Sequence, residues 1–319
     1  MRIHILTVCL FTIMYSPHTR TFSWEDIYSY VRPIMPGKME QEIVYEEYNP
    51  QNATVLRVKN KKGNVVIKAD KNQSTISLKA IKKSSDIEQL PQLTFTCTPS
   101  ATDLIIEANY DEKTTTGQIE FELIVPHRLA INVHTTEGTI YAKQLGSPCI
   151  LNTQKGDIEV RDCYNCVDAR THHKGNINFN NCHKRITCQT QYGAIKIFDA
   201  HESILASTYH GAIEMSAREI PSTSTIKLST VSGAITLHLP PDVNADLQAT
   251  TQRGTVTSVP PITLRAQTIP VNDTTWKMAR KNINGILGDV LGNSAAQIKL
   301  SSVRSDIKLL ERKPVERKA

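Results

Sequence analysis

The sequence predicts an all-β protein and, within that class, a β-solenoid (a β-helix or β-roll) with coils of about 18 residues. One ten-residue pattern, apolar-x-Thr-x-x-Gly-x-Ile-x-apolar, recurs along the chain. From Gly138 to Gly211 its glycines are spaced by 18, 19, 18 and 18 residues. Aromatic residues make up only 6% of the chain while Thr, Ile and Val are plentiful, a composition that favours stacked strands.

Some copies follow the pattern closely and others loosely. The close copies are residues 151–160, 188–197, 206–215 and 228–237. The loose copies are 133–142, 169–179 and 249–258, together with 58–67, which has Asn60 for Thr, and 300–309, in which Ser305 replaces the Gly. A meandering β-sandwich would also contain strands in which inward and outward residues alternate. It would not keep one motif in phase over so many turns, so we favour the solenoid.

Within each copy the apolar, Thr, Ile and last apolar positions alternate, so both strands would point one face inward. The glycine is expected to supply a positive φ that side chains with a Cβ resist. Burying four or five aliphatic side chains gives roughly 1.5–3 kcal/mol each, whereas ordering the backbone costs roughly 1–2 kcal/mol per residue. No coil is stable alone, and we expect an Ile column and a Thr column to stack between coils.

The N-terminus, residues 1–21, is interpreted as a signal peptide or N-terminal hydrophobic segment. Arg2 precedes an apolar run at 5–15 that is too short to span a bilayer as a helix. No small-x-small cleavage site follows, so an uncleaved anchor or a buried segment remains open. We expect an exported protein of the periplasm, the cell surface or the medium, with no transmembrane span beyond an N-terminal anchor.

The remaining chain divides into four parts. Residues 22–42 are expected to form an irregular lead, and 43–126 a strand-rich N-terminal part that caps the solenoid. Residues 127–310 hold the repeated coils, with an insertion near 260–295 in which 274–292 would be a short helix or a loop. Residues 311–319 are expected to be a solvated charged tail. The net charge of +6 is spread along the chain, so nucleic acid is not an expected partner.

Six cysteines follow the N-terminal segment, an even number that suits an exported protein with disulfides. Cys149 and Cys188 fall on inward positions and should be small core residues. Cys163 and Cys182 each lie seven residues after their glycine and should be neighbours in adjacent coils. The sequence leaves open a disulfide, free thiols, or a zinc site. The candidate zinc ligands are Cys163, Cys166, Cys182 and His183, near His172 and His173.

No catalytic motif is evident. The sequence contains no Gly-x-Ser-x-Gly elbow, no Walker or dinucleotide glycine pattern and no His-Glu-x-x-His. Carboxylates do not align from coil to coil on the outward face, since Asp157 and Glu159 are followed one coil later by asparagines. We therefore expect a non-enzyme without catalytic residues or a cofactor, and keep a polysaccharide-acting β-helix enzyme as a minor alternative.

Several stretches resemble the bacterial DUF4097 putative-adhesin family over roughly residues 43–309. They are the run 121–126 (FELIVP), 129–133 (LAINV), the Thr-x-x-Gly-Asp-Ile type of coil, 284–288 (NGILG) and 298–309 (IKLSSVRSDIKL). The resemblance implies a β-helical or β-roll fold and a cell-envelope setting, and it brings no catalytic residues. The sequence departs from the family at Ser305 and in its Cys- and His-rich middle coils.

Two functions remain. In the first, the solenoid is an adhesin-like module whose outward strand positions bind an unknown protein or carbohydrate at the cell surface. An exposed aromatic patch would support it, and the candidate residues are Tyr141, Phe179, Tyr192, Phe198 and Tyr209, with core packing the simpler account of the two phenylalanines. In the second, the solenoid is a self-associating scaffold of the envelope. We favour the first because the irregular ends look like caps that prevent stacking.

Overall fold

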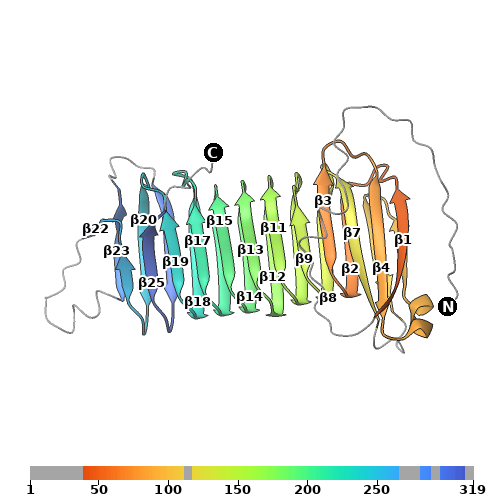
Figure 1. The fold of residues 1–319 in the computed structure, drawn as a ribbon. Helices are drawn as coiled ribbons and strands as arrows, with labels where there is room; N and C mark the ends of the chain where they lie inside the picture. The colour runs from red at the N-terminus through yellow and green to blue at the C-terminus, as the bar shows by residue number, and fades with distance from the viewer. Residues whose placement is uncertain (1–38, 111–116, 266–280, 289–294, 313–319) are drawn as a thin grey trace, which may run out of the picture. The chain divides into compact units, whose positions relative to one another are not determined.

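The computed structural model describes residues 39–110, 117–265, 281–288 and 295–312. These residues form two long sheets with one continuous apolar core between them (Figure 1). The prediction of a β-solenoid is confirmed. In the described residues the one short helix is a 3-10 turn at Ile87–Gln92, and no helix has the length and apolar character needed to cross a membrane.

The first sheet has 12 strands, and we call it sheet A. In chain order they are β1 (Glu40–Tyr48), β3 (Val65–Asp70), β4 (Ile76–Ser84), β7 (Gln118–Pro126), β9 (Ile140–Lys143), β11 (Ile158–Cys163), β13 (Ile177–Cys182), β15 (Ile195–Ala200), β17 (Ile213–Ala217), β19 (Ile235–Leu239), β21 (Val256–Ser258) and β25 (Ile307–Glu311).

The second sheet, sheet B, has 13 strands. They are β2 (Val55–Lys62), β5 (Thr94–Pro99), β6 (Asp103–Asn109), β8 (Ala130–Glu137), β10 (Cys149–Lys155), β12 (Val167–Lys174), β14 (Ile186–Tyr192), β16 (Ile204–His210), β18 (Thr225–Ser232), β20 (Ala245–Thr251), β22 (Ile262–Leu264), β23 (Asn282–Leu287) and β24 (Ala296–Ser302).

Each regular coil has two faces. It consists of a sheet B strand, a turn at the pattern's glycine, a sheet A strand and a return turn to the next coil. Successive coils pair in parallel and in register, so that Ile177 lies opposite Ile158 on one side and Ile195 on the other. All three isoleucines are fully buried. The expected Ile column therefore exists and fills the core at the first inward position of sheet A.

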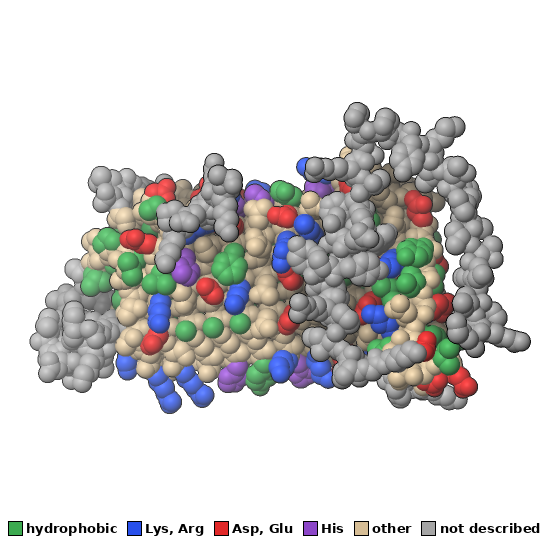
Figure 2. Space-filling model, in the orientation of Figure 1, with side chains coloured by type: hydrophobic (Ala, Val, Ile, Leu, Met, Phe, Trp, Pro, Cys, Tyr) green, Lys and Arg blue, Asp and Glu red, His purple; other side chains and the backbone are tan. Residues whose placement is uncertain are grey.

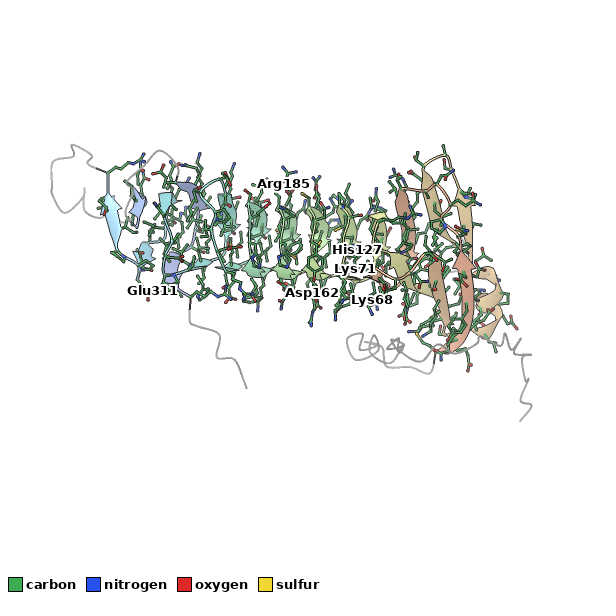
Figure 3. All side chains as sticks on the ribbon, turned by 90° about the horizontal axis from the view of Figure 1, so that it is seen from above. Lys68, Lys71, His127, Asp162, Arg185 and Glu311 are labelled. Atoms are coloured by element: carbon green, nitrogen blue, oxygen red, sulfur yellow. The ribbon has the colours of Figure 1, made fainter. Side chains whose placement is uncertain are left out.

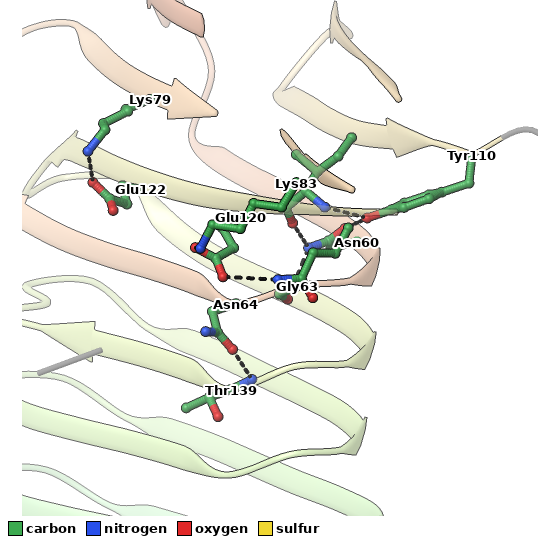
Figure 4. A network of polar contacts seen from close by, with 11 residues as sticks. Asn60, Gly63, Asn64, Lys79, Lys83, Tyr110, Glu120, Glu122 and Thr139 are labelled. Carbon is green, nitrogen blue, oxygen red and sulfur yellow. Dashed lines mark hydrogen bonds and ion pairs between the residues drawn. The ribbon is translucent and has the colours of Figure 1, made fainter. Parts of the chain in front are cut away.

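The threonine column holds the glycine turns together. Thr208 Oγ1 donates to the carbonyl oxygen of Gly193, one coil earlier, at 3.1 Å, and Thr153 does the same to Gly138 at 3.2 Å. In the first coil Asn60 takes this place, and its Nδ2 donates to the Gly63 and Ile119 carbonyl oxygens at 3.1 and 2.8 Å (Figure 4). A buried polar side chain at this position thus satisfies a carbonyl that the turn leaves without a strand partner.

The glycines are required mainly by the closeness of the neighbouring coil. A Cβ on Gly211 would lie 1.9 Å from the carbonyl oxygen of Gly193, and one on Gly193 would lie 2.0 Å from that of Gly175. A positive φ in the left-handed range occurs at Gly156, with a value of 143°, but not at Gly193 or Gly211. The expectation that a positive φ explains the glycines was therefore incomplete. The period of the sequence pattern does not reveal how closely the carbonyl oxygen of the neighbouring coil approaches.

Residues other than glycine adopt the left-handed conformation mainly at the opposite corner of the coil, near the end of four sheet A strands. Gln144, Asp162, Asn181 and Asp199 occupy this corner in successive coils with φ between 52° and 58°. Asn and Asp tolerate this region better than other side chains with a Cβ. Asn181 Nδ2 also donates to Asp162 Oδ1 at 2.8 Å, so the corner is tied from coil to coil.

The coils do not stack in chain order at either end. The last coil, β24 and β25, lies between the coil β18–β19 and the coil β20–β21, and pairs in parallel with both. At the other end the coil β2–β3 lies between β6–β7 and β8–β9. In Figure 1 the darkest blue strand accordingly lies inside the stack. The chain thus doubles back at both ends and inserts a coil into the stack.

Antiparallel strands finish both ends. Strands β4 and β1 extend sheet A beyond β7, β5 ends sheet B beside β6, and β23 and β22 end sheet B beyond β20. The described residues of the expected insertion include strands β22 and β23. Residues 282–287, inside the stretch expected as a helix or a loop, form β23, which pairs with β20 from Ala245 to Thr250. Residues 266–280 and 289–294 lie outside the described residues.

Two of the expected boundaries differ from the structure. Strand β1 begins at Glu40, inside the expected irregular lead. Glu311 ends strand β25, and Arg312 forms an ion pair with Asp199, so these two residues of the expected charged tail are part of the fold. The backbone N–H of Arg312 also donates to the Leu239 carbonyl at 2.8 Å, which continues the ladder by one residue. The N-terminal segment 1–21 lies outside the described residues.

The N-terminal cap carries buried ion pairs. Lys79 on β4 pairs with Glu122 on β7 at 3.1 Å, with side-chain exposures of 1% and 8%, and Lys83 pairs with Glu120 at 2.6 Å (Figure 4). Removing one partner of such a pair leaves an uncompensated buried charge, so the pairs fix the register of β4 on β7.

Candidate binding surface

The outer face of sheet B carries an exposed aromatic cluster over β14 and β16. Tyr192 and Tyr209 are 50% and 54% exposed, although tyrosines of a folded chain usually bury more of the ring. Two exposed tyrosines on adjacent coils therefore form the most prominent aromatic feature of this face. Figure 2 shows histidine side chains along both long edges of the molecule. His210 belongs to the aromatic cluster, since its ring contacts both tyrosines.

The parallel register aligns this cluster. Tyr192 and His210 are the residues directly before Gly193 and Gly211, so they occupy the same position in successive coils and pair across β14 and β16. Their rings stack with centroids 5.2 Å apart and an interplanar angle of 13°. Tyr209 then meets His210 edge to face at 4.7 Å and 82°. Each ring is held by its neighbour, so the cluster is ordered before any partner arrives.

A groove of about 410 Å³ lies between the two strands. The residues that line it are Gln189, Thr190, Gln191, Tyr192, Ser207, Thr208 and Tyr209. None of them carries a formal charge at neutral pH, and all but the buried threonines point away from the core. The groove thus combines aromatic faces, side-chain amides and hydroxyl groups without a charge.

Of the five aromatic candidates, the two tyrosines of β14 and β16 and one phenylalanine are exposed. Phe198, on the outer face of β15, is 37% exposed. Phe179 is 1% exposed and belongs to the core, because it takes the last inward position of its coil. Tyr141 is 8% exposed beside Val66 on the neighbouring strand β3. Neither residue is available to a partner.

The cysteines are free thiols in the structure, which is one of the three states that the sequence left open. Cys163 and Cys182 are register partners in β11 and β13, and both are buried. Burial raises the pKa of Cys182 to about 12, and the hydrogen bond with Cys163 together with burial raises the pKa of Cys149. Cys149 and Cys182 therefore stay protonated at neutral pH and are poor metal ligands and nucleophiles. The pKa of Cys163 is instead lowered by its hydrogen bond with Cys149.

The proposed zinc ligands do not converge. Among the described residues, no three His, Cys, Asp or Glu side chains are grouped so that they could hold a metal ion. His183 instead stacks on Tyr164 at 5.0 Å and on His201 at 4.5 Å. Cys166 is partly exposed and lies in the return turn, where its backbone N–H donates to Asn165 Oδ1 at 2.8 Å.

A column of stacked rings on the return turns was missed at the sequence level. It contains Tyr164, His183 and His201, and His127 lies against Tyr164 at 6.3 Å. In Figure 3 His127 lies beside Lys71, whose Nζ is 6.0 Å from the Tyr164 ring centroid. Each of the three stacked rings follows its glycine by eight residues, and this shared offset is the signal that could have revealed the column.

Burial affects the protonation of the column. Burial lowers the pKa of His183, and the neighbouring His201 lowers it further, while Asp162 and Glu219 act in the opposite direction. His201 Nδ1 lies 3.0 Å from Glu219 Oε1. The column is therefore most compatible with the fold when His183 is neutral.

A second hollow, of about 340 Å³, lies at the N-terminal cap between β1, β5 and β6. Two carboxylates line it. Asp103 pairs with Arg57 at 2.5 Å, and this hydrogen bond lowers the pKa of Asp103, while Glu47 accepts a hydrogen bond from Thr75 Oγ1. Its rim carries a single tyrosine, so this hollow lacks the stacked rings beside the groove on sheet B.

No protein-family model matches the chain, and no curated protein matches it. Solved structures that are similar include a putative adhesin from Bacteroides fragilis, with 10% identity and a TM-score of 0.48 over 84% of this chain and 97% of that one. A putative adhesin from Parabacteroides distasonis has 11% identity and a TM-score of 0.42 over 85% and 97% of the two chains. A putative cell adhesion protein from Clostridium sporogenes has 11% identity and a TM-score of 0.27 over 86% and 100%. The resemblance to the DUF4097 family stays an expectation, and the assignment of the fold rests on the strand pairing of this chain.

Proposed function

We propose that the chain is an exported, adhesin-like protein that binds a partner through the outer face of its solenoid and catalyses no reaction. The observation that carries the proposal is the pair of half-exposed tyrosines on adjacent coils, Tyr192 and Tyr209, which both contact the ring of His210 and both line the groove. Rigid aromatic side chains lose little conformational entropy on binding and dominate the energetics of recognition surfaces.

The scaffold suits this role. Strands β14 and β16 are each paired on both sides and their inward residues are buried, so the outer face is held rigidly. Solenoids offer extended surfaces of this kind to partners. The N-terminal cap argues against the alternative of a self-associating scaffold. Strand β1 is the outermost strand of sheet A, and like charges along this edge oppose end-to-end pairing of two molecules. These charges belong to Glu40, Glu42, Glu46 and Glu47.

The test of location uses the full chain with a C-terminal tag, expressed in bacterial cells and treated with protease from outside. Degradation on intact cells, with a cytoplasmic control protein left whole, is the result expected of an exposed adhesin. Recovery of the intact protein in the cytosol would refute export.

The test of binding uses the purified full chain on plates coated with mucin, fibronectin, collagen or bacterial polysaccharide. We expect retention on at least one coat, and loss of it in the double variant Tyr192→Ala/Tyr209→Ala. Tyr45→Ala is the matched control, since Tyr45 is 64% exposed but lies on β1 in the other sheet. Retention of the double variant at the wild-type level, or no retention on any coat, would refute the proposal.

A further inference from the structure

We infer that the groove between β14 and β16 binds a neutral saccharide. The inference rests on the proposed function, because it names the ligand class of the same surface. It starts from the accessible lining: two tyrosine rings, two side-chain amides and the hydroxyl group of Ser207, with no carboxylate and no cation. The hydroxyl groups of Thr190 and Thr208 are buried and already donate to glycine carbonyl oxygens. A sugar ring offers an apolar C–H face to an aromatic ring and hydroxyl groups to amides, and this lining matches both.

The polar groups are free to bind. Gln189 on β14 lies opposite Ser207 on β16, so an amide and a hydroxyl stand side by side across the groove floor. In the described part of the chain the side chains of Gln189, Gln191 and Ser207 make no hydrogen bond to another residue. An amide presents a donor and an acceptor together, which suits neighbouring hydroxyl groups of a sugar.

The uncharged zone is local to these two coils. In the same row as Gln189, the preceding coil has Arg170, which pairs with Asp168 at 2.8 Å. On the other side, Ser229 continues the row opposite Ser207, and the charged Lys227 lies two residues earlier on β18, opposite Leu205. Charged side chains therefore border the groove without lining it, and a charged ligand would find no complementary group inside it.

A peptide added as an extra strand does not fit this place. Strand β14 is paired with β12 and β16, and β16 is paired with β14 and β18, so neither offers main-chain groups to a partner. A lipid chain would need an apolar cavity, whereas the amides and hydroxyls of this lining would be left without partners. Recognition must come from side chains, as it does for a saccharide.

The test measures binding of the full chain to cellotetraose, maltotetraose and mannotetraose by calorimetry, with a sialylated and a sulfated oligosaccharide as charged comparators. We expect at least one neutral probe to bind and the charged comparators to bind more weakly. Tyr209→Ala should weaken binding about tenfold, the effect of losing one aromatic contact. Tyr209→Phe should retain most of the affinity because it keeps the ring, Gln189→Leu should weaken it, and Tyr45→Ala should leave it unchanged.

The outcomes separate the two proposals. If none of the neutral probes binds while retention on a coated plate still depends on Tyr192 and Tyr209, the ligand class is wrong and the binding surface is right. If a neutral probe binds with equal affinity to Tyr209→Ala, the saccharide site lies elsewhere and the inference is overturned. If the probes fail and retention is also absent, the proposed function itself is refuted.

Discussion

Thr208 and Gly211 depend on the same atom, the carbonyl oxygen of Gly193. The Thr208 hydroxyl donates a hydrogen bond to this oxygen at 3.1 Å, and a Cβ on Gly211 would lie 1.9 Å from it. The recurring glycine and the recurring threonine of the repeat therefore have one cause. Each coil approaches the preceding turn so closely that only a glycine fits there, and the threonine hydroxyl donates a hydrogen bond to the carbonyl oxygen of that turn.

The first prediction compares two buried threonines. Thr208→Val should destabilise the protein by about 1–3 kcal/mol, because the Gly193 carbonyl loses its side-chain donor. Thr135→Val should be neutral or stabilising, since the buried Thr135 hydroxyl makes no hydrogen bond within the described residues. Chemical denaturation of both variants measures the difference. Equal losses would contradict the role assigned to the hydroxyl.

The second prediction concerns the turn. Gly211→Ala should prevent normal stacking and lower the melting temperature strongly, because the added carbon would collide with backbone and not with a flexible side chain. Ser305→Ala is the control at the equivalent place in the last coil, where a side chain is already accommodated and where Ser305 Oγ accepts from the Gly233 N–H at 3.2 Å. We expect Ser305→Ala to lower the free energy of unfolding by about 1 kcal/mol. A Gly211→Ala variant as stable as wild type would refute the close approach.

The third prediction tests the inserted coil. Ile307→Asp should unfold the protein as completely as Ile195→Asp, since both side chains are fully buried in the same column and an unpaired charge cannot be tolerated there. If the last coil of the chain were also the last of the stack, Ile307→Asp would only fray that end. Circular dichroism and the solubility of both variants decide between the two arrangements.

The fourth prediction follows from the lowered pKa of His183. Its pKa in the folded state lies below the value of 6.5 of a free histidine, so the unfolded chain binds the proton more readily. Stability should therefore be complete above pH 6.5 and fall as the pH drops through that value. His183→Phe keeps an aromatic ring in the column and removes the proton, so the fall between pH 7.5 and 5.5 should become shallower.

Thermal melts across this range provide the measurement, and His173→Phe provides the control because His173 is exposed and lies outside the column. An unchanged slope in His183→Phe would show that other groups set the pH dependence.

The sequence was sufficient to predict the coil and its inward face. The positions of Ile195 and Thr190 recur at fixed offsets from a glycine in each copy of the pattern. A repeat of about 18 residues that buries the same positions each time predicts stacked coils. It also predicted that Cys149 and Cys188 would be buried and that Cys163 would lie beside Cys182, because these follow from the same offsets.

The order of the coils could not be predicted, since the pattern of Leu300 fits against Leu228 and against Ala249 equally well. The binding groove was predicted only in part: the alternation places Tyr209 outward, but the stacking of Tyr192 on His210 depends on ring orientations that a sequence does not specify.

The doubling back of the chain has a consequence for synthesis and export. A solenoid whose coils stacked in chain order could fold one coil at a time as the chain left the ribosome or a secretion pore. A truncated chain would then still form a regular, shorter solenoid. Here the place beside β18 and β19 is occupied by residues 296–311, which are synthesised after the coil β20–β21. The coil β20–β21 therefore cannot join the stack until β24 and β25 have been synthesised.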